Sequence, residues 1–306
     1  MSFGQTVAQI LSLFIIMVIG YIMNKRGVID EVANARFTRL IINISLPAQI
    51  VKAFVSNQGI VSNGEVLSVF GISFVMYFVY AVIGILFLIL TRVKDTQRGT
   101  YLFMMMFGNV GFMGFPVVEA MMGEEAMIYA VIFNVVFNLL VYSVGILMIG
   151  QKEGGPTFAW KKLFNMPLMS AVVSIVLYFA NIRLPETLMR SLNFMGNITT
   201  PVAMLILGSV IANMRFKELF SEWRIYLFTV VKLIVIPFVA ILLIGKLPIR
   251  SELIKGCLIV LSAMPVATNS TMLAIEYGGD VSLTSKGVFF TTLLCMITIP
   301  FITVLS

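Results

Sequence analysis

The sequence predicts an all-α polytopic membrane protein, with ten transmembrane helices arranged as two inverted five-helix repeats. Three observations lead to this fold class. The first is composition: 59% of the residues are hydrophobic and 11% are charged, whereas a soluble domain carries about 25% charged residues. The second is a set of ten apolar stretches, each long enough to cross a bilayer. The third is that motifs of the second and fourth stretches recur in the seventh and ninth.

The ten stretches follow one another with short polar connections. They are Gln5–Met23, Arg36–Val55, Val66–Leu90, Gly99–Met122, Ala126–Ile149, Leu163–Ala180, Leu188–Asn213, Trp223–Ile244, Glu252–Glu276 and Val281–Leu305. No Lys or Arg precedes the first stretch, whereas Lys25 and Arg26 follow it, so we expect a retained helix with its N-terminus outside. Ten crossings then place the C-terminus outside too. We expect a first repeat over 1–150, a cytoplasmic linker over 151–162 and an inverted second repeat over 163–306.

Composition also excludes several functions. The net charge of +7 is carried mostly by the loops expected on the cytoplasmic side, so it indicates membrane orientation and not nucleic-acid binding. Cys257 and Cys295 lie in apolar stretches without motif spacing, so we expect neither a disulfide nor a metal site. The chain has no histidine, no paired catalytic acids and no cluster of metal-ligating residues. We therefore expect no enzyme activity.

The fourth stretch contains a run that opposes a continuous helix. Gly108, Gly111 and Gly114 recur at every third position, Asn109 lies beside the first of them, and Pro116 ends the run. Glycine loses much backbone entropy in a helix, and proline has no N–H to donate. Unpaired backbone is tolerated at membrane depth only where it faces protein or a water-filled cavity. We therefore predict a broken transmembrane helix whose glycines let two backbones cross closely.

The chain repeats this design in its second half. The motif Asn-Ile-(Ser/Thr)-x-Pro-small occurs at residues 43–48 and again at 197–202, 154 positions later. The ninth stretch breaks around 263–271, and Pro265 follows Pro116 by 149 positions. Each half has five crossings, an odd number, so the second half enters the membrane from the opposite face and the repeats are inverted.

Inversion predicts where the two broken helices meet. Pro116 and Pro265 each suit the first position of the half-helix that follows the break, where a missing N–H costs nothing. The N-termini of these half-helices would approach each other near the bilayer midplane, with partial positive charge and free N–H groups directed inward. Broken helices in pairs are typical of the substrate sites of secondary transporters. Such a crossing can hold a small anion without a buried arginine.

The layout and motifs resemble the auxin efflux carrier family, which includes bacterial malonate- and malate-type permeases. The resemblance rests on Asn-x-Gly-Phe-x-Gly-x-Pro at 109–116, Asn-Ile-Ser-Leu-Pro-Ala at 43–48 and the break at Pro265. It covers nearly the whole chain, without the long cytosolic loop of the plant members. It implies the fold of the bile acid/sodium symporters, with a scaffold domain from helices 1, 2, 6 and 7 and a transport domain from helices 3–5 and 8–10. It also implies carboxylate substrates bound nearest Asn109 and the two prolines, and a homodimer through the scaffold helices.

The polar residues at the two breaks have two interpretations. Asn109 either caps a freed backbone group or donates to a substrate carboxylate, and we favour ligand contact. Thr268, Asn269, Ser270 and Thr271 resemble an N-cap cluster, yet four consecutive small polar residues exceed what capping needs. We expect Asn269 to be the ligand residue among them.

Other candidates remain open between structural and functional roles. Asn43 and Ser45 either re-satisfy the backbone freed by Pro47 or contact substrate. Lys232 lies deep in the eighth stretch. It is either a partner in a structural pair, a lysine that snorkels towards the cytoplasmic surface, or a counter-ion for the substrate. Glu119 is either a solvated acid near the outer mouth or the residue that couples transport to protons.

We therefore expect a secondary active or facilitative carrier of a small organic carboxylate in the cytoplasmic membrane, working by alternating access. The candidate substrate-binding residues are Asn109, Gly111, Gly114, Pro116, Pro265, Thr268, Asn269, Ser270, Asn43 and Ser45. A malonate-, malate-, lactate- or auxin-like anion would be the small-molecule partner, with no cofactor and with coupling to H⁺ or Na⁺ left open. The alternative is a cation/proton antiporter on a similar scaffold. Antiporters of that kind need carboxylates at the crossing, where this chain has asparagine and hydroxyl residues.

Overall fold

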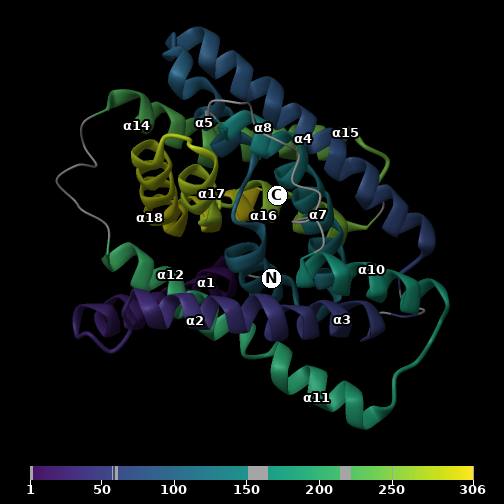
Figure 1. Cartoon of the computed structure of the whole chain (residues 1–306). Coiled ribbons are helices and arrows are strands. Elements are labelled where there is room, and N and C mark those ends of the chain that lie inside the picture. Colours follow the sequence, from purple (N-terminus) through teal and green to yellow (C-terminus); the bar gives the residue numbers. More distant parts are fainter. Residues whose placement is uncertain are drawn as a thin grey trace. The chain divides into compact units, whose positions relative to one another are not determined.

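The computed structural model describes residues 3–56, 58, 61–150, 165–213, 222–249 and 251–305, and each of the ten expected stretches contains helix there (Figure 1). Six helical spans are long and apolar enough to cross a membrane: Glu31–Ser56, Asn63–Thr91, Glu124–Ile149, Glu186–Ala212, Trp223–Lys246 and Val281–Thr303. Shorter apolar helices cover Leu11–Lys25, Val110–Met122 and Met166–Phe179. The chain is therefore an all-α, multi-pass membrane protein. The expected cytoplasmic linker, 151–162, lies outside the described residues.

The chain divides into two compact units. Unit 1 comprises Met1–Phe70, Gly111–Val135 and Phe164–Met214, and unit 2 comprises Gly71–Val110, Val136–Leu163 and Arg215–Ser306. The expected helices 1, 2, 6 and 7 all belong to unit 1. The same unit also contains the second half of the broken fourth helix and the first half of the fifth.

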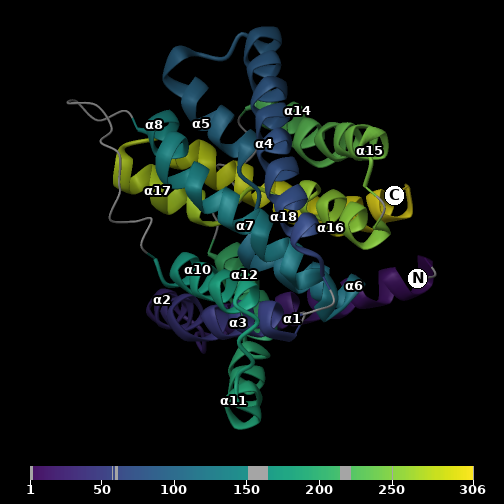
Figure 2. The ribbon, with the colours of Figure 1, turned by 90° about the vertical axis from the view of Figure 1, so that its right-hand side faces the viewer.

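Unit 1 is built from helices of both halves of the sequence. They are α1 (Phe3–Lys25), α2 (Glu31–Leu40), η1 (Ile41–Ser45), α3 (Leu46–Ser56), α6 (Phe115–Met122), η3 (Glu124–Ala126), α10 (Met166–Phe179), α11 (Glu186–Gly196) and α12 (Thr199–Ala212). Most of α7 (Met127–Leu140) also belongs here. The helices α10 and α11 both pack on α3 (Figure 2).

Unit 2 contains the two broken helices up to or across their breaks. Its helices are α5 (Asp95–Met106), α8 (Ile146–Ile149), α14 (Trp223–Val230), η5 (Val231–Val235), α15 (Ile236–Lys246), α16 (Glu252–Ser262), α17 (Asn269–Tyr277) and α18 (Val281–Leu305). Most of α4 (Asn63–Thr91), the end of α7 and the π-helical turn η4 (Val141–Gly145) complete it.

The closest helix pair of unit 1 joins α1 to α12, which lie side by side in Figures 1 and 2. A Cβ atom on Gly20 would lie 2.1 Å from the Leu205 carbonyl oxygen, and one on Gly208 would lie 1.8 Å from the Met17 carbonyl oxygen. Glycine is therefore required at both positions. Small residues permit this backbone-to-backbone approach between membrane helices, where dispersion replaces the hydrophobic effect as the packing force.

Three π-helical turns have one cause. Each ends two residues before a proline: η1 (Ile41–Ser45) before Pro47, η2 (Val110–Gly114) before Pro116, and η5 (Val231–Val235) before Pro237. A proline ring clashes with the carbonyl four residues earlier and leaves it unpaired. In all three cases, the residue that carries this carbonyl is the middle residue of the π turn. The widened turn accommodates the ring and lets the helix continue.

Both predicted helix breaks are present. Helix α5 ends at Met106, and helical structure resumes at Val110; α16 ends at Ser262, and α17 begins at Asn269. Pro116 lies in the first turn of α6, but α6 directly continues the π turn η2, so the helical segment after the break begins at Val110, six residues before the proline, and not at Pro116 as predicted. The prediction for Pro265 was wrong, because this proline lies in the linker before Thr268, the N-cap residue of α17. The linker is held extended by pairing with another segment, which a local helix-start rule does not take into account.

Candidate functional site

The linkers of the two interrupted helices meet within unit 2, where they pair through a short antiparallel bridge. Gly108 forms a bridge with Val266. The Asn109 N–H donates to the Pro265 carbonyl at 2.7 Å, and the Ala267 N–H donates to the Phe107 carbonyl at 3.1 Å. Non-helical backbone in an apolar environment is stable only when its groups are paired. The crossing thus provides partners for the backbone that each break frees.

Gly108 allows the two linkers to approach. A Cβ atom at this position would lie 3.3 Å from the carbonyl oxygen and 3.4 Å from the Cβ of Met264. A Cβ on Gly111 would meet only the Asn134 Oδ1, at 4.0 Å, so this second glycine does not serve the crossing. Gly111 and Gly114 lie in the π turn η2, on the side of the break that belongs to unit 1.

Helix α18 and an aromatic cluster support the crossing. The Val266 N–H donates to the Thr291 hydroxyl at 3.0 Å, and that hydroxyl in turn donates to a carbonyl of its own helix. The Phe107 ring lies 4.8 Å from the Phe103 ring and 5.7 Å from the Phe137 ring, centroid to centroid. The polar backbone of the linkers is therefore surrounded by apolar side chains, and electrostatic interactions there are strong.

Asn109 is the residue of the crossing with an unused donor. It is 3% exposed, and its Nδ2 has no hydrogen-bond partner. Among the described residues, it is the one buried side-chain nitrogen without a partner. Orphaned buried N–H groups are rare and costly, more so than carbonyl oxygens with a spare lone pair. The amide is therefore available to an acceptor that the protein itself does not supply.

The polar run at the start of α17 divides into two kinds of residue. The Ser270 hydroxyl donates to the Ala267 carbonyl, a local bond that the capping interpretation explains. Thr268 is the N-cap residue, yet its side chain makes no capping bond. The Oδ1 of Asn269 is buried without a partner. Capping accounts for Ser270 and leaves the Asn269 amide unexplained.

Lys232 lies in the same unit, fully buried. It is 1% exposed, and its Nζ donates to the Met105 carbonyl at 2.9 Å, in the last turn of α5. The Nζ also lies 5.9 Å from the centroid of the Tyr80 ring. Its ammonium group is thus buried and does not extend to the surface. No acidic side chain of the described residues forms an ion pair with it.

The candidates from the second helix, Asn43 and Ser45, make contacts within unit 1. Asn43 is exposed, and its Nδ2 donates to the Arg39 carbonyl, one turn earlier. The Ser45 hydroxyl lies 2.6 Å from the Thr199 hydroxyl and donates to the Met195 carbonyl at 2.8 Å. Ser45 and Thr199 occupy the same position of the repeated motif, so equivalent residues of the two halves meet directly.

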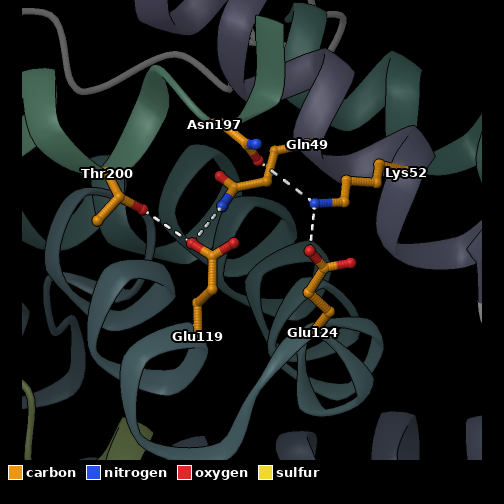
Figure 3. Close-up of polar contacts among 6 residues, drawn as sticks. All are labelled: Gln49, Lys52, Glu119, Glu124, Asn197 and Thr200. Carbon is orange, nitrogen blue, oxygen red and sulfur yellow. Dashed lines mark hydrogen bonds and ion pairs between the residues drawn. The ribbon is translucent and has the colours of Figure 1, made fainter. Parts of the chain in front are cut away.

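Glu119 belongs to a polar cluster of unit 1 (Figure 3). Its carboxylate accepts a hydrogen bond from the Thr200 hydroxyl at 2.9 Å and one from the Gln49 Nε2 at 3.2 Å. Beside it, the Lys52 Nζ contacts the Glu124 carboxylate at 2.6 Å and the Asn197 Oδ1 at 3.3 Å (Figure 3).

Sequence reasoning did not identify Gln49, Lys52 or Glu124 as part of this cluster. One signal was present: Gln49 and Lys52 follow the first copy of the repeated motif, while Asn197 and Thr200 lie in the second copy. A contact between the two copies, such as that of Ser45 with Thr199, would have brought the flanking residues together.

Chemically, the described residues of the crossing provide the unpaired Asn109 donor and the buried Lys232, beside the unpaired acceptor Oδ1 of Asn269. The Asn109 donor and a protonated Lys232 favour a negatively charged or strongly accepting solute. The described residues contain no group of three or more His, Cys, Asp or Glu that could hold a metal ion.

Comparison with known proteins identifies the family of the chain. The sequence model of a family described as "Membrane transport protein" matches residues 5–157 and 155–303. An uncharacterized transporter of Methanocaldococcus jannaschii is 26% identical over 299 residues, covering 95% of each chain. An uncharacterized transporter of Escherichia coli is 22% identical, covering 89% of this chain and 88% of the relative. A protein of Rhizobium meliloti named "Putative malonate transporter" is 22% identical, covering 76% and 74%.

Proposed function

The chain belongs to the membrane transport protein family, that of the auxin efflux carriers, and is a transporter and not an enzyme; from this premise we propose that it carries a small organic carboxylate through the cytoplasmic membrane. The observation that carries the proposal is the unpaired, buried Asn109 amide donor beside the paired linkers. A carboxylate supplies the acceptor this donor lacks. The malonate transporter name of one relative agrees with this substrate class.

The transport cycle we propose is alternating access. The carboxylate binds at the crossing, contacted by Asn109 and Asn269, with backbone of the residues around Pro265 and Thr268 beside it. Gly111, Gly114 and Pro116 would shape the half-helix that follows the first break. We propose a scaffold of helices 1, 2, 6 and 7, all of which lie in unit 1, and a transport domain of helices 3–5 and 8–10, although unit 1 also takes in Gly111–Val135 of helices 4 and 5. A homodimer through the scaffold helices completes the proposed assembly.

The proposed topology is two inverted repeats, with both termini outside. It is supported by one self-complementary contact in unit 1, that of Ser45 with Thr199, which occupy the same position of the repeated motif. Equivalent residues touch each other where a two-fold axis passes between them. The test is labelling of single-cysteine variants in intact cells with a membrane-impermeant maleimide. Arg183→Cys should be labelled and Lys94→Cys protected, and the reverse result would contradict the orientation.

Transport is tested by uptake into proteoliposomes. The panel is radiolabelled malonate, malate, lactate and indole-3-acetate, each with and without sodium and proton gradients. We expect uptake of at least one carboxylate, and Asn109→Ala should abolish it while the protein stays folded by size-exclusion chromatography. The matched control is Asn193→Ala, which removes an amide from α11 in unit 1 and should retain uptake. Full uptake by the Asn109→Ala variant would remove this residue from the site.

Coupling to an ion is a separate part of the proposal. Glu119 is the candidate for protons, because its carboxylate is held by the neutral donors of Gln49 and Thr200 and not by a cation. Glu119→Gln should then retain exchange of labelled substrate but lose the dependence of uptake on a proton gradient. Unchanged dependence would assign Glu119 a structural role and leave sodium or uncoupled transport.

A further inference from the structure

The end of α5 poses an electrostatic problem for an anion site. This helix ends at Met106, three residues before Asn109. The last carbonyls of a helix have no intrahelical partners, and together they carry about half a negative elementary charge. A carboxylate bound beside Asn109 would be repelled by this helix end. The N-terminus of α17 favours an anion there, and a positive charge at the end of α5 would offset the repulsion directly.

Lys232, when protonated, lies where it offsets that charge. Its Nζ donates to the Met105 carbonyl at 2.9 Å, one of the last carbonyls of α5. The lysine is carried by the π turn η5, before Pro237. It is 1% exposed, so solvent screens its charge weakly.

A purely structural role does not require a lysine here. Burying an ammonium group in an apolar environment is costly, and the usual compensation is a nearby acid. The charged residue lacks that compensation: among the described residues, its polar contacts are the Met105 carbonyl and the face of the Tyr80 ring. The corresponding third stretch, Val66–Leu90, contains no basic residue. Lys232 therefore has no basic counterpart in the corresponding helix of the first repeat.

We propose that Lys232 determines the anion selectivity of this transporter. It cancels the negative end of α5 and attracts the carboxylate of a substrate bound at Asn109 and Asn269, without touching the substrate itself. This inference rests on the proposed function and adds to it the source of the positive charge. It assigns the preference for anions over neutral molecules to one buried side chain.

Three variants separate charge from hydrogen bonding. Lys232→Arg keeps both the charge and a donor for the Met105 carbonyl. Lys232→Gln keeps a donor but removes the charge, and Lys232→Met removes both. Each is reconstituted and tested for uptake of the four labelled carboxylates, with competition by the unlabelled acid and by its neutral amide, for example malonate against malonamide. The measured quantity is the inhibition constant of the neutral amide divided by the inhibition constant of the acid.

We expect Lys232→Gln and Lys232→Met to lower that ratio by about tenfold or more, and Lys232→Arg to retain most of it. Lys52→Gln, which removes the other lysine that is buried among the described residues, should leave the ratio unchanged. Wild-type discrimination in the Lys232→Gln variant would overturn the inference, and Lys232 would then only cap the end of α5. Thermal stability is measured for all variants. If the Lys232→Met variant misfolds, the Gln and Arg variants alone test the inference. It then requires that their two ratios differ. If the wild-type protein takes up no carboxylate of the panel, the proposed function itself fails.

Discussion

The polar centres of the two units differ in how their side chains are satisfied. In unit 1, hydroxyls, amides and charges from both sequence halves pair with each other, as Ser45 does with Thr199 and Lys52 with Glu124. In unit 2, the Asn109 donor has no partner, and Lys232 has a backbone partner but no acid. Unit 1 is not free of unpaired atoms, since the Gln49 Oε1, the Asn34 Oδ1 and the Asn193 Oδ1 have no partner, but all three are acceptors. Paired networks stabilise a fold, whereas unpaired donors and charges are expected where a ligand binds.

The largest effect should come from breaking the close packing of unit 1. Gly208→Leu inserts a side chain where a Cβ alone would lie 1.8 Å from the Met17 carbonyl oxygen. We expect α1 and α12 to separate and destabilisation of more than about 3 kcal/mol, seen as loss of monodisperse protein in detergent. Gly245→Leu on α15 is the control, because a Cβ there meets nothing within 4 Å. Equal loss in both variants would mean that added bulk, and not this contact, is responsible.

The next effect concerns transport and not stability. Asn109→Asp is nearly isosteric but replaces the free donor by a carboxylate. We expect uptake of carboxylates to fall by about 100-fold or more, because like charges in a poorly screened site repel by several kcal/mol. Thermal unfolding should change much less than in Gly208→Leu. Retained uptake of anions, or the appearance of cation transport, would favour the antiporter alternative.

A smaller effect is expected where the two sequence halves meet in unit 1. The Ser45 and Thr199 hydroxyls share one hydrogen bond, so Ser45→Ala and Thr199→Val should be non-additive. A double-mutant cycle on thermal or denaturant stability should give a coupling energy of about 1 kcal/mol. The Michaelis constant for uptake should not change. A raised Michaelis constant with unchanged stability would return Ser45 to the substrate site.

The smallest effect should come from the ion pair of unit 1. Glu124 is 57% exposed at its side chain, so solvent weakens its attraction to Lys52. Glu124→Gln should cost less than about 1 kcal/mol and less still at high salt. Stability of this variant is measured as a function of salt concentration. A loss of several kcal/mol would show that the Lys52 charge depends on this one partner.

The sequence predicted the parts of the fold that depend on local chemistry. Glycines and prolines located both breaks, and hydropathy located the helical stretches. The position of Pro265 was mispredicted because the linker is extended by pairing with Phe107–Asn109, a contact across more than 150 residues. The partners of Glu119 and Lys232 could not be predicted from the sequence for the same reason, because Thr200 and Met105 are brought to them only by tertiary packing. The repeated motif was the one long-range signal, and it anticipated that the halves correspond but not that Ser45 and Thr199 touch.

The widened turns before Pro47, Pro116 and Pro237 have a consequence for the direction of side chains. A π turn inserts one residue into the helical repeat, which rotates everything beyond it by about 100° relative to an unbroken α-helix. In the eighth span, because of this rotation, the residues after Pro237 do not continue the helix face that carries Lys232. Replacing Pro237 by alanine would permit the ordinary register to compete, and the buried ammonium group would then turn away from the end of α5.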